Sequence, residues 1–181
     1  MDVTIQERVF SFTSEYDISG PGLAYYARKA YFSFNDRLQI QAEDGRVLAK
    51  IRGYFSPFRR RHDFLLSDGG IYRFWCEKIW KGVFVCAGNE ESYRLYQHKG
   101  LSYSIFQSDR QIAAFVKNRV VFGKGNKYDL RVDSDANLAV VLCMVLTVNT
   151  AENDDKDATV TIDFGNLGPE DKHFDPSWEP R

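Results

Sequence analysis

One stretch limits what this chain can fold into more than any other, an apolar run from Leu138 to Val148 in which only Thr147 is polar. A helix that is apolar on every side has no face for water, so it must be enclosed by protein or by lipid. The run has 11 residues, whereas a helix needs roughly 20 to cross a bilayer. Enclosure within the protein is therefore the favoured interpretation.

The residues around this run favour a helix over about residues 135–150. Ser134 or Asp135 can accept a hydrogen bond from the first free backbone N–H groups, and Asp133 and Asp135 oppose the positive end of such a helix. The alternative is a buried strand, because short apolar runs are ambiguous and this one contains several β-branched valines. Its length, the candidate cap and its unbranched leucines and methionine favour the helix.

The first half of the chain contains an internal repeat with a spacing of about 22 residues. Each copy has an aromatic-Ser step, an alternating segment, a glycine turn and a second segment. The aromatic-Ser steps are 9–12, 31–34 and 54–57, and the turns are Gly20–Gly22, Asp44–Gly45 and Asp68–Gly70. Asp-Gly and Gly-Gly supply the positive φ values that tight hairpin turns require. Three hairpins in succession predict a β-meander, and they are too few to close a solenoid or a propeller.

Short segments separated by turn signals continue to Val132, giving about 12 strands before the apolar helix. So many strands tend to curl, and the helix needs something around it. A mostly β fold, a closed antiparallel barrel enclosing the helix, satisfies both requirements and leaves no free sheet edge. We expect one domain over residues 1–164, with a further strand at 158–164, and an irregular acidic tail over 165–181 held by Phe174 and Trp178.

The net charge of -1 hides an asymmetry along the chain. Residues 134–181 hold 10 acids and 3 bases, a charge of -7, which leaves 15 acids and 21 bases, or +6, in residues 1–133. A basic body suggests either an anionic partner or a tail that folds back on it. An unrelated distribution of solvated charges is the alternative.

Leader and cysteine patterns favour a cytoplasmic protein. The first residues contain neither a basic leader nor a continuous apolar segment. The three cysteines, Cys76, Cys86 and Cys143, form no CxxC pair, and an odd number fits reduced thiols better than a disulfide framework. No transmembrane segment is expected, and any membrane attachment would be peripheral.

The order of these motifs resembles the tubby C-terminal-like superfamily, and within it the LURP-one-related family. The resemblance rests on the aromatic-Ser segments 9–12 and 31–36, on Asp44-Gly45 followed by 47–51, and on 128–132 leading into the apolar run. It spans about residues 5–150. It implies a closed 12-stranded barrel around a hydrophobic C-terminal helix. Because the superfamily includes phosphoinositide-binding tubby domains and phospholipid scramblases, it also implies a non-enzymatic binding or scaffold role that faces lipid.

The best candidate for a binding site is the basic segment at the third aromatic-Ser step. Its arginines offer planar donors suited to phosphate, and its phenylalanines could rest at a lipid interface. The residues predicted to bind an anionic head group are Arg52, Arg59, Arg60, Arg61 and His62, with Phe55 and Phe58 at the membrane interface. The alternative is an ordinary solvated hairpin turn. Replacing Arg59, Arg60 and Arg61 with Ala should weaken salt-sensitive binding to phosphoinositide liposomes.

Other chemistries find less support in the sequence. The scattered His62, His98 and His173 show no metal-ligand spacing, and no cofactor motif is visible. Gly123–Lys127 lacks the Gly-Lys-Ser/Thr ending of a phosphate loop and is interpreted as a hairpin turn. The tryptophans are interpreted as barrel packing, and a nucleic-acid partner is not expected. A protein partner, a barrel hydrolase with a pocket, and a scramblase-like protein remain as alternatives; a helix that fills the barrel would argue against the hydrolase.

Overall fold

The computed structural model describes residues 1–10, 13–28, 36–54, 61–78, 81–118, 125–154 and 171–181. Within them, the chain forms twelve strands and one helix. They are β1 (Asp2–Phe10), β2 (Thr13–Gly20), β3 (Leu23–Arg28), β4 (Asp36–Ala42), β5 (Val47–Tyr54), β6 (Arg61–Leu66), β7 (Ile71–Lys78), β8 (Val83–Gly88), β9 (Glu91–His98), β10 (Ser102–Gln107), β11 (Arg110–Asn118), β12 (Lys127–Val132) and α1 (Leu138–Asp154). The expected strand at 158–164 and the expected domain boundary at 164 lie outside these residues.

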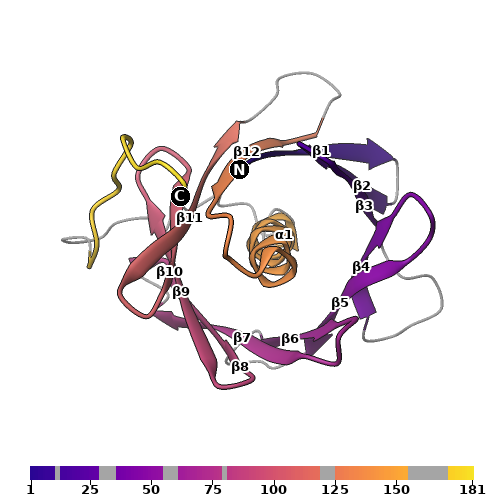
Figure 1. The fold of residues 1–181 in the computed structure, drawn as a ribbon, viewed down its shortest axis with the longest axis horizontal. Helices are drawn as coiled ribbons and strands as arrows, with labels where there is room; N and C mark the ends of the chain where they lie inside the picture. The colour runs from indigo at the N-terminus through magenta and orange to yellow at the C-terminus, as the bar shows by residue number, and fades with distance from the viewer. Residues whose placement is uncertain (11–12, 29–35, 55–60, 79–80, 119–124, 155–170) are drawn as a thin grey trace.

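The twelve strands form one closed sheet. Each strand pairs antiparallel with the next along the chain, and β12 pairs with β1 to close the circle. Figure 1, which looks along the barrel, shows this ring of strands surrounding α1. The mostly β, closed antiparallel barrel predicted from the sequence is thus confirmed, and closure leaves no free sheet edge.

The sequence repeat corresponds to consecutive hairpins, which explains its two-strand period. Its three glycine turns connect β2 to β3, β4 to β5 and β6 to β7. Gly45 and Gly69 have φ values of 82° and 89°, a region that side-chain-bearing residues rarely adopt. Asp44 and Asp68 tighten these turns, because each carboxylate accepts a hydrogen bond from the backbone N–H two residues later.

The apolar run, residues 138–148, forms the first part of α1 and fills the barrel. Seven consecutive helix residues, 140–146, have exposed fractions of 0 or 1%. They pack in one cluster with the inward side chains of the strands, including Ile5, Ile40, Ile51 and Phe64. A helix enclosed on every side needs no polar face, and the one polar residue of the run, Thr147, donates its hydroxyl to the carbonyl of Cys143.

The helix begins later than its sequence suggested, at Leu138, and it continues to Asp154. Asn137 is the capping residue, because its Oδ1 accepts a hydrogen bond from the backbone N–H of Val140 at 3.3 Å. Capping by Ser134 or Asp135 was therefore a wrong expectation. Asp135 instead makes two contacts with the Arg110 guanidinium, at 2.9 and 3.1 Å, and residues 133–136 form a turn that leads into the barrel.

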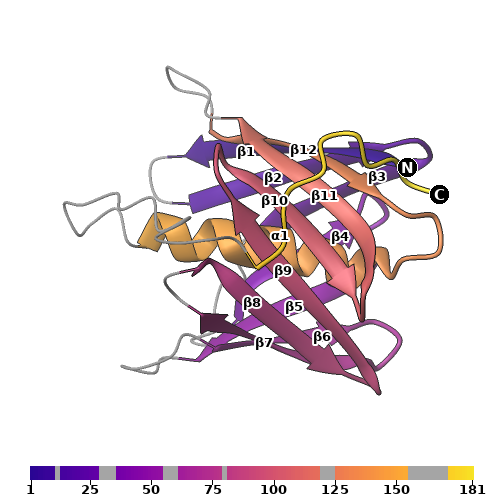
Figure 2. The ribbon, with the colours of Figure 1, turned by 90° about the vertical axis from the view of Figure 1, so that its left-hand side faces the viewer.

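At the end of the barrel where α1 begins, backbone hydrogen bonds continue the pairing of neighbouring strands. The amino terminus of Met1 donates to the carbonyl of Val132 at 2.8 Å, and the N–H of Asp133 donates to the carbonyl of Ile112. Figure 2 shows α1 running from this end through the barrel towards the other. Because neighbouring strands are antiparallel, the end of β5 at Tyr54 and the start of β6 at Arg61 lie at the end of the barrel that α1 reaches last.

Candidate functional site

The structure places Arg52 near the end of β5 and Arg61 and His62 at the start of β6. Because side chains alternate along a strand, the burial of Ile51 and Phe64 inside the barrel puts Arg52 and Arg61 on the outer surface. His62 shares the inward side of β6 with Phe64, so its imidazole does not lie on the same face as the two guanidinium groups. Its predicted role in binding stays a prediction.

Four of the residues predicted to bind lipid lie outside the part of the chain that the structure describes. They are Phe55, Phe58, Arg59 and Arg60.

Arg52 and Arg61 belong to a larger group of outward-facing side chains on three neighbouring strands. We call it the arginine–aromatic face, and it consists of Arg52 and Tyr54 on β5, Arg61 and Asp63 on β6, and Ile71, Arg73 and Trp75 on β7. The strand register brings these side chains together, since Tyr54 is opposite Arg61, and Asp63 is opposite both Arg52 and Arg73.

Asp63 is the centre of this face. Its Oδ1 lies 3.4 Å from Nε of Arg61 and 3.7 Å from Nε of Arg73, and Arg52 is its cross-strand neighbour on β5. Two guanidinium groups share this carboxylate and the third arginine is opposite it on the neighbouring strand, so the formal charge of the four side chains is 3 - 1 = +2. The Asp63 side chain is 16% exposed and that of Arg73 is 56% exposed, which leaves the cations more accessible than the anion. Long, exposed ion pairs of this kind are weak and exchange readily for a better anion.

Apolar and aromatic surface accompanies this positive charge. Tyr54 and Ile71 are the large hydrophobic residues classed as exposed in the described part of the chain, at 42% and 55%. The Arg61 guanidinium lies 5.5 Å from the centroid of the Tyr54 ring, within the range of a cation–π interaction. A shallow hollow of about 230 Å³ opens beside them, lined by Asp63, Ile71, Arg73, Trp75 and Ala87. Trp75, expected to serve barrel packing, therefore also contributes to an accessible surface.

Sequence reasoning found part of this face and missed the rest. It selected Arg52 and Arg61 from local charge. It did not select Tyr54, which carries no charge, or Arg73 and Trp75, which are distant in sequence from the basic segment. The alternation of inward and outward residues along each strand was the signal that could have found them. Buried Phe64 marks the inward side of β6, and buried Tyr72 and Phe74 mark that of β7. Joining the outward positions required the strand register, which the sequence did not provide.

Ionisable groups inside the barrel are held by structural hydrogen bonds. Glu91 Oε2 accepts hydrogen bonds from the hydroxyls of Tyr72 and Tyr93, both at 2.7 Å, and its Oε1 accepts one from Gln107 at 3.3 Å. The Tyr72 and Tyr93 hydroxyls lower the pKa of the Glu91 carboxyl, because they stabilise its charged form. This network connects β7, β9 and β10 inside the barrel.

A buried carboxylate, that of Glu7, holds the segment before β12 against β1. Glu7 Oε2 accepts hydrogen bonds from the backbone N–H and the side-chain amide of Asn126, at 3.0 and 2.7 Å. A Cβ at Gly125 would meet the backbone oxygen of Glu7 at 2.7 Å, so this close approach requires glycine. Gly125 and Asn126 thus belong to a packed connection, and the preceding residues 119–124 lie outside the described part of the chain.

The described residues also include nucleophiles, of which two cysteine thiols are deeply buried. Burial raises the pKa of the Cys86 and Cys143 thiols, which keeps both protonated. Cys76, Cys86 and Cys143 are free thiols. Ser104 Oγ and His98 Nε2 are 2.7 Å apart, which is the spacing of a nucleophile and its base. Both side chains point away from the barrel interior but are buried, and the Phe174 ring lies against His98.

Two searches within the described residues found no site of the kind sought. No group of three or more His, Cys, Asp or Glu side chains there could hold a metal ion. No helix in the described part of the chain is long and apolar enough to span a membrane.

Comparison with known proteins gives one match. A family model described as LURP-one-related matches residues 1–149. The matched region includes all twelve strands and most of α1, and it stops before the described residues 171–181. No curated protein and no solved structure matches the chain.

Proposed function

This chain belongs to the LURP-one-related family, and on that premise we propose that it is a non-enzymatic binding module whose arginine–aromatic face binds the phosphorylated head groups of anionic membrane lipids. The observation that carries the proposal is the arrangement around Asp63. Arg61 and Arg73 share this one carboxylate, with Arg52 opposite it on β5, beside exposed Tyr54 and a shallow hollow.

Phosphate suits this arrangement because guanidinium groups donate two parallel hydrogen bonds to phosphate oxygens. The Asp63 carboxylate is too far from Nε of Arg61 and of Arg73 for a short charge-assisted hydrogen bond. A phosphate group with more oxygens and more charge can therefore compete for both arginines. In the sequence, Arg59 and Arg60 immediately precede Arg61 and add to the local positive charge.

The exposed apolar groups fit a membrane surface better than a free anion. Tyr54 can present its ring at the depth of the lipid head groups, where amphipathic aromatic side chains are favoured. Ile71, on the other side of the hollow, adds apolar contact. A face that combines arginines with exposed aromatic and aliphatic groups is suited to peripheral attachment, with charge supplying most of the affinity.

The way the barrel is filled supports a non-enzymatic role. The alternative, a barrel hydrolase, requires a cavity in which ionisable groups converge, and α1 occupies the position where such a cavity would form. The carboxylates Glu7 and Glu91 are already committed to hydrogen bonds between structural elements. The outer surface is what remains available to a partner.

Liposome sedimentation of the full chain tests the proposal. Vesicles of phosphatidylcholine containing a phosphoinositide are compared with phosphatidylserine vesicles of equal total charge. The test variant is Arg61→Ala/Arg73→Ala. The control variant is Arg28→Ala/Arg46→Ala, which removes the same charge from exposed positions on β3 and in the β4–β5 turn, including an arginine 5.7 Å from a tyrosine ring centroid.

At about 1 kcal/mol for each basic residue near an anionic surface, losing two arginines should weaken partitioning roughly 30-fold. The control should retain most of the binding, and raising the salt concentration should weaken wild-type binding because exposed charges are screened. Equal sedimentation of wild type and the Arg61/Arg73 variant would refute the proposed face. Equal binding to both charge-matched vesicles would refute specific recognition of the phosphorylated head group.

A further inference from the structure

The last eleven residues, 171–181, lie across the outside of the barrel, and we call them the C-terminal strap. Figure 2 shows this segment, in yellow, crossing the strands from β9 to β12 on its way to the end of the barrel where α1 begins. Its end is fixed there, since the N–H of Arg181 donates to Oδ1 of Asp133 at 2.8 Å and its carbonyl accepts from the N–H of Ser134 at 3.0 Å. The strap contains neither helix nor strand.

The surface beneath the strap has an apolar floor. Val83, Tyr96 and Phe106 form a small cluster, separate from the main core, with exposed fractions of 3, 8 and 9%. Their register places them on the outer side of β8, β9 and β10, because the adjacent Phe84, Leu95 and Ile105 face the main core. The Tyr96 and Phe106 rings meet edge to face at 5.6 Å. This part of the outer wall is therefore an apolar surface that is shielded from water.

Strap side chains rest directly on this floor. The Phe174 ring lies 5.3 Å from the His98 ring, centroid to centroid, and the ammonium of Lys172 lies 5.1 Å from the centroid of the Phe106 ring. Beneath them His98 is hydrogen-bonded to Ser104, so the floor presents a satisfied polar pair next to its aromatic surface. Phe174 itself stays partly exposed, as expected for a side chain lying in an open groove.

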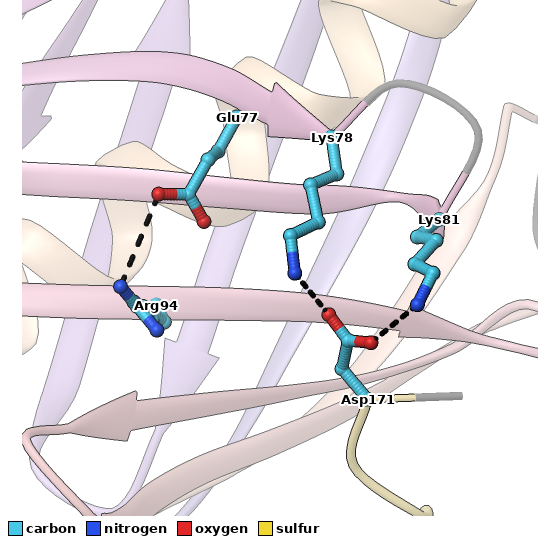
Figure 3. A network of polar contacts seen from close by, with 5 residues as sticks. All are labelled: Glu77, Lys78, Lys81, Arg94 and Asp171. Carbon is cyan, nitrogen blue, oxygen red and sulfur yellow. Dashed lines mark hydrogen bonds and ion pairs between the residues drawn. The ribbon is translucent and has the colours of Figure 1, made fainter. Parts of the chain in front are cut away.

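Charged groups border the floor at both ends. Lys78 and Lys81 approach the two oxygens of the Asp171 carboxylate at 2.5 and 2.6 Å, forming a clamp (Figure 3). The two lysines lower the pKa of Asp171 to about 2, so the clamp holds a charged carboxylate at any ordinary pH. At the other end, Arg131 donates to the carbonyl of Pro176 at 3.3 Å and lies 6.0 Å from the Trp178 ring centroid.

These contacts define a recognition pattern in the strap. An acidic residue is followed by an aromatic residue at the third position and another at the seventh, which are Asp171, Phe174 and Trp178. The groove supplies the complement in the same order, a pair of lysines, an aromatic floor and an arginine. Each residue of the pattern contacts a side chain of the barrel, and extended peptides are recognised in grooves through such side-chain contacts.

The strap is held by few main-chain contacts, and the clamp is exposed to solvent. The Lys78 and Lys81 side chains are half and one-third exposed, and ion pairs in such positions contribute little to stability. Segments with few buried contacts open locally at a much lower free energy than the whole fold, whereas the strands beneath belong to the closed sheet. The groove can therefore become free while the barrel stays folded.

We propose that this groove is a docking site for an extended peptide of a partner protein, in which an acidic residue is followed by aromatic residues at the third and seventh positions, and that the C-terminal strap occupies it as an intramolecular competitor. The site extends from the end of β7, at Lys78, over β8 to β12, whereas the arginine–aromatic face lies on β5, β6 and the preceding part of β7. The inference is independent of lipid binding.

The test uses a fluorescent synthetic peptide with the sequence of residues 171–181, titrated against the full chain and followed by fluorescence anisotropy. The wild type should bind it weakly, because its own strap is present at an effective concentration on the order of millimolar. Asp171→Ala/Phe174→Ala, which weakens the strap in the protein but leaves the peptide intact, should bind it at least tenfold more tightly.

Adding Lys78→Ala/Lys81→Ala to the strap-weakened protein should reduce peptide affinity at least tenfold. A matched control, Lys50→Ala/Lys127→Ala, removes two lysines outside the groove, on β5 and β12, and should have no such effect. A peptide of scrambled order should not bind. Arg61→Ala/Arg73→Ala should leave peptide affinity unchanged, which separates this result from the outcome of the liposome experiment.

Failure of the strap-weakened protein to bind the peptide would overturn the proposal, as would binding that does not depend on the clamp lysines. Binding of that protein to anionic vesicles but not to the peptide would overturn it in favour of a lipid surface. Cooperative unfolding of each variant is checked first. If the double variant does not fold, hydrogen exchange of the wild type provides the second measurement, since excess peptide should accelerate exchange in residues 172–180 and unchanged exchange would refute displacement.

Discussion

Replacing Leu142 with Ala is the most direct test of how α1 is enclosed. Leu142 lies in the apolar part of the helix and is 0% exposed, so the change removes a buried methine and two buried methyl groups and leaves a space inside the barrel. Transfer of the lost carbon atoms accounts for about 2.4 kcal/mol, at about 0.8 kcal/mol for each buried group. The cavity adds to this because the closed sheet cannot collapse onto it, and the expected total is about 3 to 4 kcal/mol.

The neighbours of Leu142 make the test specific to enclosure. Single alanine replacements of Val140, Val141, Met144 and Leu146 should each cost at least about 1 kcal/mol, because every position from 140 to 146 is buried. A helix lying on a surface would instead show costs that rise and fall with a period of about 3.6 residues. Ile71→Ala, at a position that is 55% exposed, serves as the control and should change stability by no more than about 0.5 kcal/mol.

Equilibrium urea denaturation measures these differences through the midpoint and the slope of the transition. An unchanged slope shows that the variant still unfolds from a similarly compact native state. A loss below about 1 kcal/mol for Leu142→Ala, or a periodic profile in which every third or fourth position tolerates alanine, would refute enclosure on all sides. The stronger change Leu142→Asp places an unpaired charge in the same space and should prevent folding.

Two further predictions concern single interactions. Glu91→Gln removes a carboxyl whose pKa is lowered in the folded protein. The variant should therefore be less stable than wild type at pH values above the unfolded pKa of about 4.3. This difference in the free energy of unfolding should disappear as the pH falls through the lower pKa of the folded state. Urea titrations from pH 3 to 7 check this, and a difference that grows on acidification would contradict the Glu91 network. Asn137→Ala should cost about 0.5 to 2 kcal/mol, whereas Ser134→Ala should be nearly neutral in the same assay, because Asn137 and not Ser134 caps α1; equal effects would place the cap elsewhere.

The fold was predictable because its main determinants are local or periodic. The glycine turns mark the hairpins, alternation marks the strands, and a solvent-free helix requires an enclosing wall. The start of α1 was less predictable because Asn137, Asp133 and Asp135 are all good capping residues by type. Tertiary contacts decide among them. The Arg110 guanidinium donates hydrogen bonds to the Asp135 carboxylate, and the backbone N–H of Arg181 donates one to Oδ1 of Asp133.

The candidate site was only partly predictable because it combines residues through register. The basic run around Arg61 is visible in the sequence, but Arg73 and Trp75 join it only when β7 is aligned with β6. The strap shows the same limit more strongly. Phe174 and Trp178 were expected to hold the tail, and they do contact the barrel, yet nothing local indicated that Lys78 and Lys81 would receive Asp171.

The position of α1 at the end of the chain order has a kinetic consequence. During synthesis all twelve strands leave the ribosome before residues 138–154 do, so the strands of the wall are available before the helix that must fill it. The pairing of β1 with β12 joins residues more than 120 positions apart, and loop closure of that range is slow. Final ring closure and helix entry are therefore expected to coincide as the late step of folding, and a nascent chain halted near residue 135 should remain an unfilled, protease-sensitive sheet.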